Sequence, residues 1–312
     1  FELSINMRIC SMQRTHPLWL PATIITSLVL LCLTPAFADE PANPAPADDK
    51  PTVLITGANR GLGLEFARQY AADGWHVVAT ARKPEQADDL KALSVEIAAL
   101  DVADPASIEA LAKSLEGRPI DLLINNAGIF PRVSSIEEID FDDYSRTLVV
   151  NTVGPVRVTR ALLPNLRASE MKTVVNITSR LGSIALTDNG VFYGYRESKA
   201  ALNMFTRTLA NELKPEGFTC LTIHPGWVKT DMCGANASLT PEESISGMRA
   251  VIAERGPADT GTYWSYSGEE VPWTFTRSYG CGQISGSPNL LMFRSGTLGF
   301  YDLAGQTGTH NF

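Results

Sequence analysis

The sequence predicts a single α/β domain over residues 51–273, in which a doubly wound, mainly parallel sheet of seven strands is flanked by helices. Short apolar runs rich in β-branched residues alternate there with amphipathic stretches, which indicates consecutive βαβ units. Several runs are apolar throughout, as expected of strands that helices cover on both faces. A glycine-rich turn follows the first run, where sheets of this class bind nucleotides.

The expected elements follow one another in a regular order. Strands are expected at Thr52–Thr56, His76–Thr80, Val95–Leu100, Ile120–Ile124, Thr173–Thr178, Thr219–His224 and Gly261–Ser265. Helices are expected at Leu64–Asp73, Pro105–Leu115, Tyr144–Leu166 and Ser198–Leu213. The chain has no internal repeat of fixed period, which argues against a repeat architecture.

The two ends of the chain differ from this domain in composition. Residues 1–38 combine basic residues, an apolar run over 22–33 and the small residues Ala36 and Ala38, a layout typical of a secretory signal peptide. An N-terminal membrane anchor and a misplaced start are the alternatives, but the run is short for a stable membrane span. Residues 39–50 are interpreted as a Pro/Ala-rich linker, and residues 274–312 as a poorly structured tail.

Composition limits the compartment and the partners. A cleaved signal peptide would place the protein in the periplasm or outside the cell, and without one the protein would be cytoplasmic. The net charge of −8 provides no basic field for nucleic acid. The five cysteines match neither a zinc-binding spacing nor a dense disulfide framework.

The glycine-rich turn is a candidate phosphate-binding loop. Gly57, Gly61 and Gly63 stand at G-x-x-x-G-x-G spacing between an expected strand and an expected helix. Glycines let backbone N–H groups approach a pyrophosphate closely, and the N-terminus of the following helix attracts its negative charge. An ordinary βα turn is the alternative, because many loops contain glycine.

The residues that follow the second strand favour NADP(H) over NAD(H). NAD-binding proteins of this architecture usually carry a carboxylate there for the ribose 2′-hydroxyl. Arg82 stands there instead, and Arg60 lies in the glycine loop. Guanidinium groups bind phosphate through charge-assisted hydrogen bonds. The alternative is that Arg82 and Lys83 form only a solvated pair of charges.

Tyr195 and Lys199 form a candidate acid–base pair. They stand four residues apart where a helix is expected to begin, so they share one helix face. A neighbouring ammonium stabilises a phenolate, which would lower the pKa of Tyr195 and suit it to proton transfer. Such pairs also arise by chance on helix surfaces. Tyr193 is a weaker candidate, because Glu197 four residues later would raise a phenol pKa.

Ser179 is a candidate hydrogen-bond donor to the substrate. It follows the strand Thr173–Thr178, and ligands bind at the carboxyl ends of strands in such sheets. Its hydroxyl would therefore meet a substrate carbonyl oxygen. The alternative is a loop serine that caps a turn.

Seven motifs, in this order, resemble those of the short-chain dehydrogenase/reductase family. They are TGANRGLG (56–63), Asp101-Val102, NNAG (125–128), VNTVGP (150–155), NITS (176–179), YRESK (195–199) and HPGWVKTDM (224–232). Within the family, the segments YGYRESKAALNMF and GEEVPW resemble the Sniffer-type carbonyl reductases and the bacterial C-factor-like proteins. The motifs follow the family pattern except at Thr178, where serine is common.

The resemblance implies a Rossmann-type fold and a role for each motif residue. Tyr195 would protonate the carbonyl oxygen as hydride arrives from the nicotinamide, Lys199 would bind the nicotinamide ribose, and Ser179 would hold the carbonyl. Asn151 would sit at a helix irregularity and hold a water for a proton relay. The other cofactor contacts would come from Gly57, Asn59, Arg60, Gly61, Leu62 and Gly63 at the phosphates, Asp101 and Val102 at the adenine, Asn125, Ala127 and Gly128 on the adenosine side, and Pro225, Gly226, Val228 and Thr230 beside the nicotinamide.

The expected function is that of an NADP(H)-dependent oxidoreductase that transfers hydride between the nicotinamide and a carbonyl or alcohol carbon, as a carbonyl reductase does. A non-catalytic nucleotide-binding signalling protein on the same fold is the alternative, because fold does not fix function. No metal is required when Tyr195 and Ser179 polarise the carbonyl. The apolar residues in 181–192 and 229–246 favour a partly apolar small-molecule substrate. The resemblance also implies a homodimer or homotetramer through the helices at 144–166 and 198–213.

Overall fold

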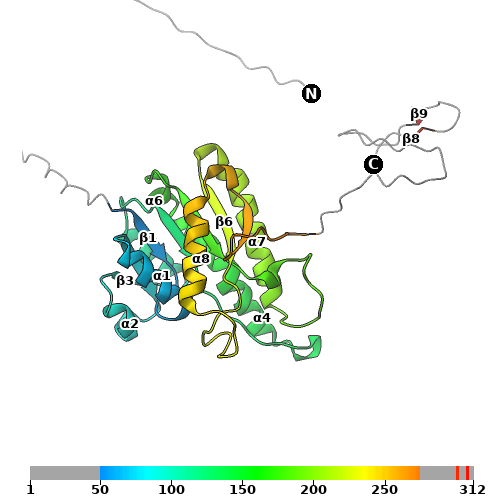
Figure 1. The fold of residues 1–312 in the computed structure, drawn as a ribbon, viewed down its shortest axis with the longest axis horizontal. Helices are drawn as coiled ribbons and strands as arrows, with labels where there is room; N and C mark the ends of the chain where they lie inside the picture. Colours follow the sequence, from blue (N-terminus) through cyan, green and yellow to red (C-terminus); the bar gives the residue numbers. More distant parts are fainter. Residues whose placement is uncertain (1–49, 275–299, 302–306, 309–312) are drawn as a thin grey trace, which may run out of the picture. The chain divides into compact units, whose positions relative to one another are not determined.

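The computed structural model describes residues 50–274, 300–301 and 307–308. Residues 50–274 contain one parallel sheet with the strand order β3-β2-β1-β4-β5-β6-β7 (Figure 1). Its strands are β1 (Thr52–Ile55), β2 (His76–Ala81), β3 (Glu96–Ala99), β4 (Leu122–Asn125), β5 (Thr173–Ile177), β6 (Thr219–His224) and β7 (Thr262–Ser265). Every neighbouring pair is parallel, so the predicted fold class is confirmed.

Helices connect these strands and cover both faces of the sheet. They are α1 (Gly61–Ala72), α2 (Asp88–Lys91), α3 (Pro105–Ser114), α4 (Phe141–Leu148), α5 (Gly154–Ala161), α6 (Leu163–Arg167), α7 (Tyr195–Leu213) and α8 (Pro241–Glu254). Parallel neighbours need such crossovers, because a tight turn cannot return the chain to the start of the next strand.

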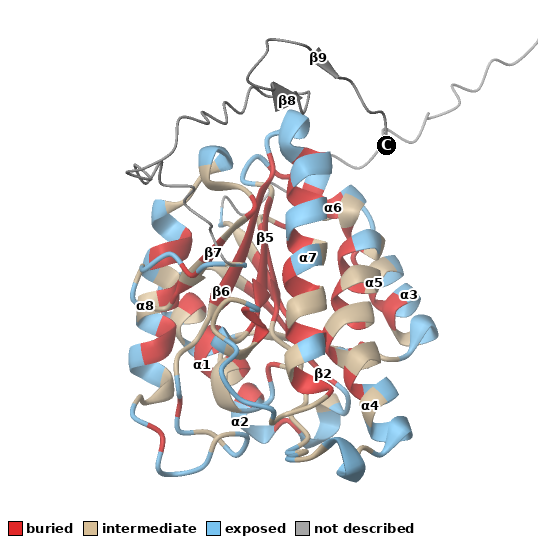
Figure 2. Cartoon of the chain, turned by 90° about the vertical axis from the view of Figure 1, so that its right-hand side faces the viewer, coloured by how far each residue is buried: buried red, intermediate tan, exposed pale blue. Residues whose placement is uncertain are grey.

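The alternation of side chains along the strands divides the core into two layers. Val53 and Ile55 of β1 pack on one face of the sheet with α1 and α8, through residues such as Phe66 and Met248. Leu54 points to the other face, which α3, α5 and α7 cover. Figure 2 shows the buried strands between these two groups of helices. Burial on both sides explains why the strands are apolar at successive positions.

The strand order also locates the candidate site. The chain runs outward from β1 to β3 and then returns to place β4 on the other side of β1. The loops that leave β1 and β4 therefore diverge at the carboxyl edge of the sheet, and a crevice forms between them. The glycine loop follows β1 at this point.

The single long helix predicted at Tyr144–Leu166 is wrong. The structure divides this segment into α4, a π-helical turn (Val149–Val153), α5 and α6. Pro155 has no N–H to donate to a preceding carbonyl, which favours a local change in helical pitch. Gly154 packs so closely that a Cβ atom there would lie 3.0 Å from the Val102 carbonyl oxygen.

The sequence analysis missed α2 and α8. The start of α8 carries a capping box, in which the Thr240 side chain and the Glu243 side chain each bond the other residue's backbone N–H. The motif Thr240-Pro241-Glu242-Glu243 is thus a helix-start signal that was available in the sequence. Because α8 begins at Pro241, it takes up part of the segment 229–246, whose apolar residues were expected to favour a partly apolar substrate.

The chain ends are described only in part. Within the predicted tail, β8 (Phe300–Tyr301) pairs antiparallel with β9 (Thr307–Gly308). The predicted signal peptide, most of the predicted linker and the rest of the tail lie outside the described residues, so these assignments stay predictions. None of the helices in the described part of the chain is both long and apolar enough to cross a membrane.

Candidate active site

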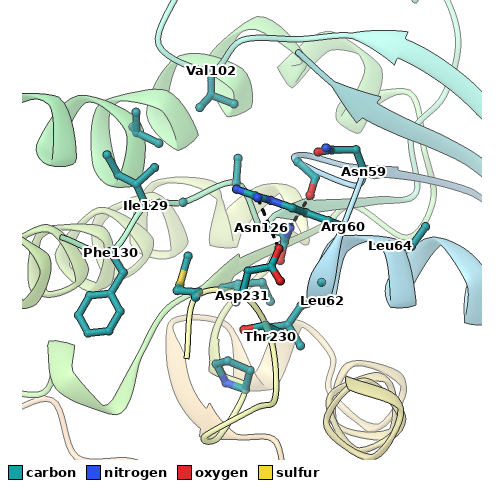
Figure 3. A pocket seen from close by; sticks show the side chains of 18 of the residues that line it. Asn59, Arg60, Leu62, Leu64, Val102, Asn126, Ile129, Phe130, Thr230 and Asp231 are labelled. Atoms are coloured by element: carbon teal, nitrogen blue, oxygen red, sulfur yellow. Dashed lines mark hydrogen bonds and ion pairs between the residues drawn. The ribbon is translucent and has the colours of Figure 1, made fainter. Parts of the chain in front are cut away.

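A cleft of about 1110 Å³ opens at the carboxyl edge of the sheet (Figure 3). Residues of the glycine loop, of the segments that follow β2, β3 and β4, and of the loop after β6 line it. With this volume, the cleft is large enough for a ligand of dinucleotide size. The predicted site residues that line it are Gly57, Asn59, Arg60, Gly61, Leu62, Arg82, Asp101, Val102, Ala127, Gly128, Tyr195, Lys199, Pro225 and Thr230.

The glycine loop has the geometry of a backbone cradle. Gly57 and Gly61 adopt φ values of 65° and 55°, which L-residues with a side chain rarely adopt. Gly63 does not line the cleft but packs behind the loop, where a Cβ atom would lie 2.3 Å from the Gly57 carbonyl oxygen. No side chain caps the N-terminus of α1, so its first N–H groups remain available to an anion.

Asn126 holds this loop in place and was not predicted. Its Nδ2 donates to the carbonyl oxygens of Thr56 (2.9 Å) and Gly57 (3.1 Å). In return, the Thr56 hydroxyl accepts hydrogen bonds from the backbone N–H groups of Asn126 (2.9 Å) and Ala127 (3.0 Å). The turn after β4 is thus fastened to the turn after β1. The NNAG motif contained this residue, but its spacing did not distinguish Asn126 from Asn125.

Asn125, which was predicted to line the adenosine side of the cofactor, is not among the residues that line the cleft. Its side chain is buried away from the cleft, and its Nδ2 donates to Thr159 Oγ1 (3.1 Å) and Asn176 Oδ1 (2.9 Å). It therefore joins β4 to α5 and β5. Asn125 is the last residue of β4, and successive residues of a strand point to opposite faces.

Gly226 and Val228 were predicted to lie beside the nicotinamide. In the structure they determine the shape of the loop after β6. Gly226 has a φ of 81°, and a Cβ atom there would lie 2.5 Å from the Leu239 side chain. Val228 is 2% exposed and pairs with Leu239 across the base of the loop. Neither residue lines the cleft directly. Their neighbours Pro225 and Thr230 do.

The candidate acid–base pair lies at the start of α7. Tyr195 is 8% exposed, and the Lys199 Nζ lies 5.8 Å from the centroid of its ring. Lys199 Nζ donates to the carbonyl oxygen of Ile177 at 2.9 Å. The two side chains therefore share a helix face, as predicted, and both line the cleft.

Burial dominates the protonation of both groups. It raises the pKa of Tyr195 to about 12, although the Ser179 side chain opposes the rise as a hydrogen-bond partner. It lowers the pKa of Lys199 to about 8. The predicted net lowering of the Tyr195 pKa is thus wrong for this structure. Removing a phenolate from water costs more here than neighbouring groups return.

The Ser179 side chain lies beside Tyr195, but Ser179 is not among the residues that line the cleft. Its Oγ accepts a hydrogen bond from the Leu181 N–H at 3.2 Å, and its carbonyl oxygen accepts one from the Tyr263 hydroxyl at 2.6 Å.

The loop that follows Ser179 is anchored to residues that end the domain. Ser183 Oγ donates to the Pro272 carbonyl at 2.5 Å, and the Ile184 N–H donates to the Trp273 carbonyl at 3.2 Å. Tyr263 on β7 was not predicted as part of the site.

Asn151 lies in the π-helical turn, so the predicted helix irregularity is confirmed. Its Oδ1 accepts from the Ile129 N–H (2.8 Å), and its Nδ2 donates to the Ile129 carbonyl (2.9 Å) and to Ser198 Oγ (3.0 Å). The side chain therefore connects the loop after β4 to α7. Its predicted role in holding a water stays a prediction.

The charges along the cleft are mostly positive. Arg60 forms an exposed ion pair with Asp231, with 3.5 Å between Nη1 and Oδ2 (Figure 3). Arg82, Arg132 and Arg146 also line the cleft and have no carboxylate partner among the described residues. The described part of the chain contains no group of three or more His, Cys, Asp or Glu side chains that could hold a metal ion.

Comparison with known proteins identifies the family. Residues 51–239 match the family model described as short chain dehydrogenase. The chain belongs to that family. It is 44% identical to C-signal of Myxococcus xanthus in an alignment of 166 residues. This alignment covers 53% of this chain and 100% of that protein.

Solved structures of carbonyl reductases have the same fold. An NADPH-bound carbonyl reductase from chicken fatty liver aligns with a TM-score of 0.67 and 36% identity, over 72% of this chain and 99% of that one. The carbonyl reductase Sniffer of Drosophila melanogaster aligns with a TM-score of 0.68 and 33% identity, over 72% of this chain and 100% of that one. The chain is therefore a short-chain dehydrogenase whose structural neighbours include carbonyl reductases.

The hydrogen bonds of Asn126 lead to a stability prediction. Asn126→Asp keeps the shape of the side chain but replaces the donating amide with a carboxylate that faces two carbonyl oxygens. We expect the free energy of unfolding to fall by about 1–3 kcal/mol, measured by urea denaturation without added nucleotide. Asn59→Asp is the matched control, because Asn59 is exposed in the cleft, and a similar loss in both variants would contradict this role of Asn126.

The buried ammonium of Lys199 leads to a prediction about pH. Between its folded pKa of about 8 and its ordinary value of 10.5, the unfolded chain binds more protons than the folded protein. The destabilisation by the buried charge is therefore complete below pH 8 and disappears as the pH rises toward 10.5. We expect Lys199→Met to gain stability relative to the wild type below pH 8, and this gain to shrink by roughly 2 kcal/mol by pH 10. Denaturation of both proteins across this range measures the difference, and a constant difference would contradict the prediction.

Proposed function

We propose that the protein is an NADP(H)-dependent carbonyl reductase that acts on small molecules, with Tyr195 as the general acid. The observation that carries this proposal is that Tyr195, with Ser179 beside it, and Lys199 line the same cleft as the glycine cradle. A hydride acceptor held at Tyr195 would lie in the same cleft as the cofactor. The carbonyl reductases among the structural neighbours support the reaction class.

The residues of the cleft fit a dinucleotide with a 2′-phosphate. The positions of Gly57 and Gly63 leave no room for Cβ atoms, as a backbone that closely approaches a pyrophosphate requires. Arg82 lines the cleft after β2, where an NAD-binding protein usually carries a carboxylate. NADPH bound here would supply the hydride, and the NADPH-bound carbonyl reductase from chicken fatty liver supports this choice of cofactor.

The protein supplies the proton and the charge stabilisation. With a pKa near 12, Tyr195 stays protonated at neutral pH and can donate its phenolic proton to the carbonyl oxygen as that oxygen gains charge. The Ser179 hydroxyl would donate a hydrogen bond to the same oxygen. The Lys199 ammonium, 5.8 Å from the ring centroid, would stabilise the phenolate left behind. At neutral pH the tyrosine is therefore in the protonated form that reduction requires, whereas oxidation of an alcohol would require the phenolate.

A non-catalytic nucleotide-binding signalling protein is the second candidate. The observation in its favour is the 44% identity to a protein named C-signal. The burial of Tyr195 and Lys199 together argues against it, because placing a phenol and an ammonium in the interior costs stability that a binding-only protein need not lose. An assembly into a homodimer or homotetramer, and export by a signal peptide, also remain proposals.

Removal of the Tyr195 hydroxyl tests the reaction. We expect Tyr195→Phe to lower kcat/KM for NADPH-dependent reduction at least about 100-fold, because the phenyl ring cannot donate a proton. The assay follows NADPH consumption with a panel of aldehydes and ketones. Tyr193→Phe is the matched control and should retain activity. Equal rates for the wild type and Tyr195→Phe would show that the assigned acid is wrong.

Charge reversal at Arg82 tests the cofactor. Arg82→Asp removes a cation from the proposed 2′-phosphate site and adds a repelling carboxylate. We expect the Kd for NADPH to rise at least about tenfold more than the Kd for NADH, measured by fluorescence titration. If both dissociation constants rose by the same factor, Arg82 would not contact the phosphate.

A further inference from the structure

Beside Tyr195 the cleft combines an aromatic wall with a guanidinium group. The centroid of the Phe130 ring lies 4.3 Å from that of Tyr195 and 5.1 Å from that of Phe192. Arg132 follows on the same loop, and its guanidinium carbon lies 5.8 Å from the Phe130 centroid. Phe130, Arg132 and Met232 all line the cleft. Figure 3 shows Phe130 well apart from Asn59 and Leu62 of the glycine loop.

Arg132 is held in place without being neutralised. Its Nη2 donates to the Met232 carbonyl at 2.9 Å, and its guanidinium lies over the Phe130 ring. Within the described residues it makes no ion pair, unlike Arg60, which pairs with Asp231. A guanidinium carries five N–H donors, so most of those of Arg132 remain for a ligand.

The proposed cofactor does not account for this cation. Arg60 and Arg82 come from the segments after β1 and β2, where the 2′-phosphate would bind. Arg132 comes from the loop after β4 and lies one aromatic ring away from the catalytic tyrosine. In a chain of net charge −8, a cation fixed beside the reacting group is a specific feature of the substrate side.

We propose that Arg132 binds an anionic group of the substrate, so that the preferred substrates are carbonyl compounds that carry a carboxylate or a similar acid beyond a flat apolar part. This proposal rests on the reductase function proposed above. The carbonyl would lie at Tyr195 and Ser179, the apolar part against Phe130, and the acid at Arg132. Phe130 contacts both groups, since its ring centroid lies 4.3 Å from that of Tyr195 and 5.8 Å from the guanidinium carbon of Arg132.

A pair of matched substrates tests the proposal. We would compare kcat/KM for NADPH-dependent reduction of 4-formylbenzoate and of its methyl ester, which differ mainly in charge. A charge-assisted contact predicts that the wild type prefers the acid by about tenfold or more. Higher salt should weaken this preference, because the contact lies near solvent. A wild type that reduces both compounds equally well would overturn the proposal.

Variants at two arginines assign the effect to a residue. We expect Arg132→Gln to abolish the ratio between acid and ester, and Arg132→Lys to restore part of it by returning the charge. Arg146→Gln is the matched control, because Arg146 also lines the cleft without a carboxylate partner among the described residues, and it should keep the ratio. A ratio that survives in Arg132→Gln, or is lost in Arg146→Gln, would contradict the role of Arg132.

The same assay separates this proposal from the one on which it rests. If the wild type reduces neutral aldehydes with NADPH but shows no preference for the acid, only the substrate assignment fails. If it reduces no carbonyl compound at all, the reductase function fails and the substrate assignment fails with it.

Discussion

The contact between the turn after β1 and the turn after β4 is the constraint on which the rest of the site depends. Asn126 bonds the carbonyls of Thr56 and Gly57, while the Thr56 hydroxyl accepts from the backbone after β4. Gly63 must approach the Gly57 carbonyl closely for the helix α1 to start there. These bonds join two strands that are neighbours in the sheet but far apart in the sequence. They fix the crevice where the strand order reverses, and so they place the cradle in the same cleft as Tyr195.

Burial at the Tyr195 end of the cleft has consequences for both members of the candidate acid–base pair. Tyr195 and Lys199 are each withdrawn from water, so each is driven toward its neutral form. A neutral phenol is the form that a proton donor needs. The same burial makes the ammonium of Lys199 costly, and its hydrogen bond to the Ile177 carbonyl offsets part of that cost. The site therefore achieves its protonation pattern through solvent exclusion more than through a local charge.

The sequence predicted the sheet well because strand burial and glycine spacing are local signals. All seven strands of residues 51–273 were found to within two residues at each end, and the strand Thr219–His224 matches β6 at both ends. The prediction of one long helix at 144–166 was wrong because the apolar periodicity continues through the π-helical turn. In the sequence, Pro155 just after this turn is the signal that the helix changes there. Asn126 and Tyr263 were missed for a different reason. Their roles come from hydrogen bonds to residues distant in the chain, which no local pattern encodes.

The anchoring of the loop after β5 has a consequence for truncated forms of the protein. Ser179 and its loop are held by Tyr263, Pro272 and Trp273, which follow Ser179 in the chain by about ninety residues. A chain that ended before Tyr263 would contain the glycine cradle and Tyr195 but would lack every one of these anchors. The final residues of the domain thus complete the candidate site as well as the fold.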